Sequence, residues 1–194
     1  MARHLLTSWS TLLLIGCIDV GDFEFVDEIP VVGENNCAPP REARVACVLD
    51  GDTFDLEGCG DGNERVRLLG IDAPEISHNG EEADCWGDEA SAELRRLIDG
   101  RTVTLTFDEE CEGVFGRTLA YAYLSPDEVD VEPDEVGDED GAILVNELLL
   151  SRGAARLFGE ERFGEVLLQD RLDAAQAQAQ ARGLGLWGAC PETR

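Results

Sequence analysis

The sequence predicts an α+β fold, in which a small five-stranded β-barrel carries three α-helices. Five short segments are rich in alternating or β-branched residues, as strands are, and three other segments have the residue spacing or composition of helices. Along the chain these segments run as three strands, a helix, two strands and two helices. This order fits a closed barrel with helices packed on it.

Turn signals separate the strands. Asp50-Gly51-Asp52 lies between the first two strands, and a glycine-rich turn at residues 60–63 precedes the third. The last two strands flank a loop that ends at Gly116-Arg117. The expected strands are residues 44–49, 53–56, 65–71, 101–107 and 118–124.

The first helix is expected at residues 88–99, where Leu94 and Leu97 belong to an apolar set at helical spacing, with Asp88 as N-cap and Gly100 as the stop. A short helix at residues 143–152 should end at a glycine. The longest is expected at residues 165–182, where the alanine content favours helix.

Length and charge limit the organisation. The 194 residues suit one domain, and 42 acidic against 15 basic side chains give a formal net charge of -27. Such acidity, taken alone, argues against a nucleic-acid partner. Much of it lies in residues 19–34 and in residues 127–140, which read as an acidic insertion; a solvated loop is a better interpretation of the insertion than a calcium loop, because its spacing is not that of an EF-hand.

The N-terminus resembles an export signal. A short basic start is followed by a mostly apolar stretch far below the roughly 20 residues that span a bilayer, ending in Leu14-Ile15-Gly16-Cys17. This ending resembles a bacterial lipoprotein box, in which Cys17 carries lipid; an ordinary signal peptide is the alternative. We therefore expect a signal peptide at residues 1–16, an acidic tether at 17–40, one domain at 41–190 and a tail at 191–194. The protein would be exported and attached to the membrane of the cell envelope through Cys17.

Setting Cys17 aside leaves six cysteines, an even number in an exported chain. Three disulfides are possible, in any of 15 pairings. A zinc site is a poor alternative because no Cys-x-x-Cys pair is present.

Two acidic side chains stand where strands meet turns. Asp52 follows the first strand, and Asp72 follows the third in Ile71-Asp72-Ala73-Pro74-Glu75. Carboxylates on neighbouring strand ends, together with a backbone carbonyl, are oxygen ligands that suit calcium. Asp-Gly-Asp alone is a common turn, but its combination with Arg67 one strand before Asp72 is more specific.

From about residue 44 to residue 187 the chain resembles the staphylococcal nuclease family. Five ordered motifs carry the resemblance: Val48-Leu49-Asp50-Gly51-Asp52-Thr53, Arg67-Leu68-Leu69-Gly70-Ile71-Asp72-Ala73-Pro74-Glu75, Gly87-Asp88-Glu89-Ala90-Ser91-Ala92, Phe115-Gly116-Arg117-Thr118-Leu119-Ala120-Tyr121 and Val145-Asn146-Glu147. The family's barrel is an oligonucleotide-binding fold.

The resemblance implies a calcium-dependent nuclease, an endonuclease-like phosphodiesterase that hydrolyses DNA, RNA or both. Asp52, Asp72 and the carbonyl of Ala73 would bind Ca²⁺. Arg67 and Arg117 would hold the phosphate, and Glu75 would position or deprotonate the attacking water. The protein is expected to be a monomer, and a non-catalytic nucleic-acid-binding or calcium-binding surface lipoprotein is the alternative.

The chain departs from the family around the substrate. Gly113-Val114-Phe115-Gly116 stands where relatives often carry Lys and Tyr that contact a terminal phosphate, and the tyrosines of the base pocket are missing. Phe158 or Phe163 could offer a stacking face instead. The family alignment also places Cys85 and Cys111 in loops beside the cleft, which predicts a disulfide between them.

Overall fold

The computed structural model describes residues 37–77, 80, 82–125, 141–158 and 166–190. The expected signal peptide with Cys17, nearly all of the tether, the insertion at residues 127–140, the tail and Phe163 lie outside the described residues. Among the described residues no helix is long and apolar enough to cross a membrane.

Five strands form a closed barrel, which confirms the predicted fold. Their order is β3-β2-β1-β5-β6, and a parallel pairing of β3 with β6 closes the ring. The other neighbours are antiparallel, as expected for strands joined by turns. The strands are β1 (Arg41–Val48), β2 (Thr53–Leu56), β3 (Arg65–Leu68), β5 (Thr102–Thr106) and β6 (Thr118–Leu124).

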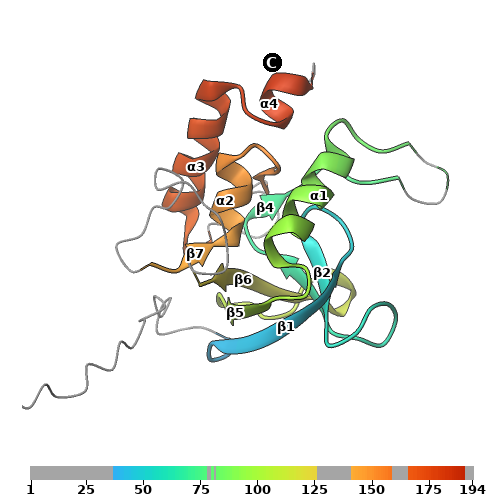
Figure 1. The fold of residues 1–194 in the computed structure, drawn as a ribbon. Coiled ribbons are helices and arrows are strands. Elements are labelled where there is room, and N and C mark those ends of the chain that lie inside the picture. Colours follow the sequence, from blue (N-terminus) through green and yellow to red (C-terminus); the bar gives the residue numbers. More distant parts are fainter. Residues whose placement is uncertain (1–36, 78–79, 81, 126–140, 159–165, 191–194) are drawn as a thin grey trace, which may run out of the picture.

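The helices cover one end of this barrel (Figure 1). α1 packs on β1 and α2, while α2 packs on β6 and α3. The core is continuous, since Leu94 and Leu97 of α1 and Leu172 of α3 are buried in the same cluster as the inward-facing strand residues. The helices are α1 (Gly87–Ile98), α2 (Val145–Ser151), α3 (Gln169–Arg182) and the one-turn α4 (Leu186–Ala189).

The third expected strand is divided at Gly70. Its backbone has φ 71°, the left-handed region that glycine adopts readily, and the chain bends there. The two residues after the bend form β4 (Ile71–Asp72), which pairs with β8 (Arg156–Leu157) outside the barrel. β7 (Ile143–Leu144) adds a short pair to β6. The bend at Gly70 places Asp72 at the mouth of the barrel rather than along its wall.

The predicted disulfide between Cys85 and Cys111 is wrong. The bridges are Cys37–Cys111, Cys47–Cys59 and Cys85–Cys190. The antiparallel register of β1 with β5 brings the chain just before β1 beside the end of β5, so Cys37 meets Cys111, and the Cys37 amide donates to the Asp108 carbonyl at 2.9 Å. Cys85, in the turn before α1, instead lies against the residue that follows α4.

Candidate active site

Asp52 is held in the turn between β1 and β2, and its side chain is almost fully buried. Gly51 makes this possible, because a Cβ there would lie 2.5 Å from the Cβ of Ala73 and 2.9 Å from that of Ala90. The Asp52 carboxylate accepts hydrogen bonds from the Ala73 amide at 2.7 Å and the Thr53 hydroxyl at 2.9 Å. The turn between β1 and β2 is thereby fixed to the segment that follows β4.

Arg67 joins the two acids predicted as metal ligands. From β3 its guanidinium reaches Asp52 Oδ2 at 2.5 Å and Asp72 Oδ1 at 3.1 Å, and only 13% of its side chain is exposed. The two carboxylates therefore converge on one positive group.

Asp72 has a second arginine partner that the sequence did not reveal. The β4–β8 pairing sets Asp72 opposite Arg156, whose Nε and Nη2 donate to Asp72 Oδ2 at 3.1 and 3.0 Å. This side chain is 55% exposed. No signal in the sequence linked it to the site, because the two residues are 84 positions apart and meet only through the short pair of strands.

The backbone of Glu75 is held on both sides, whereas its side chain is exposed. Its amide donates to Asp84 Oδ2 at 3.2 Å, and its carbonyl accepts from the Asp84 amide at 2.9 Å. Gly87, at the start of α1, packs against the same carbonyl, since a Cβ there would come within 2.2 Å of it. α1 begins at Gly87, and its N-cap is Trp86 rather than the expected Asp88.

Arg117 stands at the end of a tight loop before β6. The loop is closed by the Gly113 amide, which donates to the Arg117 carbonyl at 2.8 Å, and by a bridge between Glu112 and Thr118. Within it Phe115 has φ 69°, an uncommon backbone conformation for a bulky residue. The Arg117 guanidinium carbon lies 5.9 Å from the centroid of the Phe115 ring.

These side chains meet at one cavity of about 420 Å³, called here the arginine cavity. Arg67, Asp72 and Glu75 line it from the barrel end, and Arg117 lines it from the opposite loop. Phe115 and Phe158 supply its aromatic walls. Its lining residues are Arg67, Leu68, Leu69, Gly70, Ile71, Asp72, Glu75, Gly113, Phe115, Arg117, Leu119 and Phe158. Four of the predicted site residues thus share one space, while Asp52 and Ala73 are not among its lining residues and Asp52 is joined to it through Arg67.

The carboxylates of Asp52 and Asp72 are oxygen ligands of the type that a hard cation prefers, although two side chains are few for one cation. Burial raises the pKa of Asp52 to about 7 against the lowering effect of Arg67, so its negative charge is only partly compensated. Among the described residues no three His, Cys, Asp or Glu side chains gather into a possible metal site. Calcium takes 6 to 8 oxygen ligands, so a cation on Asp52 and Asp72 would need backbone carbonyls and water for the rest.

Two further motif residues have structural partners. The side chain of Asn146, in α2, accepts from the Ala122 amide at 3.1 Å and donates to the Leu69 carbonyl at 2.9 Å. Glu147 forms an ion pair with Arg171 of α3. They fix α2 to the barrel and to α3 and do not line the arginine cavity.

Comparison with known proteins agrees with this geometry. A family model described as "Staphylococcal nuclease homologue" matches residues 65–189. The chain is 28% identical over 180 residues to a thermonuclease of Staphylococcus hyicus, covering 91% of this chain and 94% of that protein. It is 31% identical over 142 residues to a thermonuclease of Staphylococcus intermedius, covering 72% of each, and 30% identical over 129 residues to a probable endonuclease of Pyricularia oryzae, covering 64% of this chain and 43% of that protein. Because the family model spans more than half of the chain, the protein belongs to the staphylococcal nuclease family.

Proposed function

We propose that the protein is an exported, calcium-dependent nuclease that hydrolyses phosphodiester bonds of DNA, RNA or both. Its family membership makes it a hydrolytic nuclease; the metal, the location and the residue roles are the proposal. The observation that carries it is the arginine cavity, where two guanidinium groups and an exposed carboxylate face the same space.

Each residue type matches one need of the reaction. A guanidinium is a planar fork that bonds phosphate oxygens and stays charged, so Arg67 and Arg117 hold the phosphate and stabilise the added negative charge as water attacks phosphorus. Glu75 takes the proton of the attacking water. The P–O bond to the leaving oxygen then breaks, giving two ends, one of which carries the phosphate.

Asp52, Asp72 and the carbonyl of Ala73 would hold the calcium, which supplies a second electrophile when bound. The positions of Asp52 and Asp72 make this proposal specific, because both now share Arg67 as their counter-charge. A cation on these carboxylates would replace that counter-charge. Arg67 would then be able to turn its guanidinium to the phosphate.

The first prediction concerns activity and its residues. Purified protein should release acid-soluble nucleotides from nucleic acid with calcium and not with a chelator. Glu75→Gln should lower kcat by about 10²- to 10⁴-fold with little change in KM, as expected for loss of a general base. Arg67→Ala and Arg117→Ala should lower kcat and raise KM, because both bind phosphate in the ground and transition states.

Arg96→Ala is the matched control, since Arg96 lies on the exposed face of α1, where it forms an ion pair with Glu93. It should leave both constants unchanged. Full activity of folded Glu75→Gln and Arg67→Ala proteins would refute the mechanism, and failure of the wild type to cut any nucleic acid would leave the non-catalytic alternative.

The second prediction concerns location. Three disulfides among the six remaining cysteines favour an oxidising compartment, and Cys17 would carry the lipid. Cys17→Ala should abolish incorporation of labelled fatty acid and release the protein from the membrane fraction, while the purified nuclease keeps its kcat. Equal labelling of the two proteins would disprove lipid attachment at Cys17.

A further inference from the structure

Phe115 is an exposed aromatic side chain at the mouth of the site. Its relative exposure is 92%, and Leu167, at 46%, is the other exposed large hydrophobic residue among those the structure describes. With so much of the residue accessible, the contact with Arg117 leaves ring surface available for a further group. A single exposed apolar side chain is common on protein surfaces, so the backbone conformation and the place of this ring are needed as well.

The backbone at Phe115 makes the position more unusual. At φ 69° an L side chain is strained, and glycine would avoid this strain. The loop maintains the conformation with its own hydrogen bonds and with the Cys37–Cys111 bridge at its base. The strained backbone therefore presents the ring to solvent instead of turning it inward.

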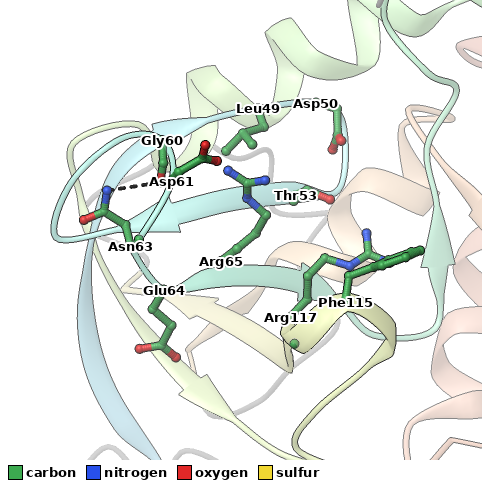
Figure 2. Close-up of a pocket in the computed structure, with 12 residues that line it drawn as sticks. Leu49, Asp50, Thr53, Gly60, Asp61, Asn63, Glu64, Arg65, Phe115 and Arg117 are labelled. Carbon is green, nitrogen blue, oxygen red and sulfur yellow. Dashed lines mark hydrogen bonds between the residues drawn. The ribbon is translucent and has the colours of Figure 1, made fainter.

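The ring also borders two cavities. Phe115 and Arg117 line the arginine cavity, and they line a second cavity of about 480 Å³, called here the hairpin cavity, whose far side is the turn between β2 and β3. Figure 2 shows Phe115 and Arg117 side by side on one side of the hairpin cavity, with Arg65 and Asp61 across from them. Phe115 and Arg117 thus form a boundary that the two cavities share.

The charges of the two cavities differ. In the arginine cavity Arg67 and Arg117 offer guanidinium groups to a phosphate and are matched by two carboxylates, Asp72 and Glu75. In the hairpin cavity three carboxylates, those of Asp50, Asp61 and Glu64, stand against Arg65 and the shared Arg117. A phosphate is disfavoured beside three carboxylates. An uncharged nucleobase is not, because its N–H groups can donate to carboxylate oxygens while its face packs on an aromatic ring.

We propose that Phe115 is a nucleobase-stacking residue, and that a nucleic-acid single strand crosses it from the arginine cavity into the hairpin cavity. The phosphate to be cut lies at Arg67 and Arg117, and the base of one flanking nucleotide stacks on Phe115. The inference rests on the proposed nuclease function and adds its substrate form, because a base stacked on a protein ring must be unpaired and unstacked from its neighbour.

The test uses dinucleoside monophosphates, which contain one cleavable bond, with either base present or replaced by an abasic sugar. Wild-type protein should lose about 5- to 150-fold in kcat/KM, mainly through KM, when the stacking base is removed, the range measured for base–aromatic stacking. Phe115→Ala should show that loss on the complete substrate and no further loss on the abasic one. Phe115→Trp should restore discrimination.

Two controls separate the ring from the fold. Leu167→Ala removes the other exposed hydrophobic side chain and should keep the wild-type ratio between the two substrates. Phe115→Gly relieves the backbone strain, so it should unfold in urea no earlier than the wild type and still lose discrimination.

A second measurement does not depend on cleavage. A fluorescent single-stranded oligonucleotide should bind Glu75→Gln protein more tightly, by the same factor, than the Glu75→Gln, Phe115→Ala double variant. The proposal is overturned if Phe115→Ala still discriminates against the abasic substrate, or if the two proteins bind the oligonucleotide equally. An inactive wild type with Phe115-dependent binding would refute the proposed hydrolysis and leave the stacking role in place.

Discussion

Asp55 shows how a single buried charge can stabilise this barrel. Its side chain is fully buried on β2, yet it accepts two hydrogen bonds from Arg65, at 2.8 and 3.1 Å, and one from the Gly60 amide at 2.8 Å. Burial alone would raise the pKa of Asp55, but the hydrogen bonds from Arg65 and Gly60 outweigh it and hold the pKa below its usual value of 3.8. The ionised form is thus the one that the fold stabilises.

The third prediction follows from that direction. Asp55→Asn should lower the free energy of unfolding at pH 7 by about 2 to 3 kcal/mol, since it removes the carboxylate that accepts two hydrogen bonds from Arg65. A carboxylate with a lowered pKa contributes its full stability above the unfolded-state value and loses it as pH falls through the folded-state value. The difference between the two proteins should therefore be constant from pH 7 to pH 5 and shrink below about pH 4.

Urea unfolding at several pH values measures this difference. Glu64→Gln is the control, because Glu64 and its partner Arg41 are 41% and 40% exposed and such surface pairs contribute about 1 kcal/mol or less. A stability difference for Asp55→Asn that grows as the pH falls would contradict a lowered pKa of Asp55 in the folded protein.

At the scale of elements, local sequence patterns predicted the strands and helices better than they predicted where these elements end and contact one another. The bounds of β2 and β6 were predicted as observed, because turn residues flank an uninterrupted strand pattern in each case. The long strand expected at residues 65–71 is divided, since a left-handed glycine is not distinguishable from an ordinary one by sequence. α3 begins at Gln169, after a turn at Val166 and Leu168, although helical composition starts earlier.

The same difference between local patterns and contacts of distant segments holds for the candidate site. Arg67, Asp72, Glu75 and Arg117 were identified from motifs, and they line one cavity because each motif stands at a strand or loop end. Arg156 and the Cys37–Cys111 bridge were not predictable, since both depend on contacts between distant segments: β4 with β8, and the start of β1 with the end of β5. Such contacts form only when distant segments pair in the folded chain, and they leave no local pattern in the sequence.

The fourth prediction concerns the loop that carries Arg117. The Cys37–Cys111 bridge closes 74 residues, against 12 for Cys47–Cys59, and chain entropy assigns about 4 and about 3 kcal/mol to them. Replacing Cys37 and Cys111 by serine should lower stability and also free the base of the loop. Where the variant remains folded, kcat on a dinucleoside monophosphate should fall by about 10- to 100-fold, since small misplacement of a phosphate-binding group is costly.

Replacing Cys47 and Cys59 by serine is the matched comparison, because it also removes one bridge but leaves the base of the Arg117 loop fixed. Its kcat on a dinucleoside monophosphate should stay close to that of the wild type. If both pairs of substitutions lower kcat equally at equal stability, the bridge at Cys111 has no particular role in positioning Arg117.

At the scale of the whole molecule, the formal net charge of -27 opposes a polyanionic substrate. In the arginine cavity the charges are close to balanced, because Arg67 and Arg117 line it together with Asp72 and Glu75, and Arg156 pairs with Asp72. Charges farther than about 8 Å are largely screened at physiological salt, so the cavity can act while the surrounding surface repels. Encounter and local binding should thus respond to salt in opposite directions.

The fifth prediction is an unusually weak dependence of binding on salt. Each phosphate contact to a single strand contributes a slope of about -0.7 in a plot of log binding constant against log salt concentration, so two or three contacts give about -1.4 to -2. Screening of the acidic surface acts oppositely and brings the slope nearer zero. Binding of a single-stranded oligonucleotide to Glu75→Gln protein, at fixed free calcium and between about 50 and 300 mM salt, measures it. In Arg117→Ala the slope should be less negative by about 0.7, because one phosphate contact is lost. A slope steeper than about -4 would mean that an extended basic surface binds the strand, and the binding would then not be confined to the arginine cavity.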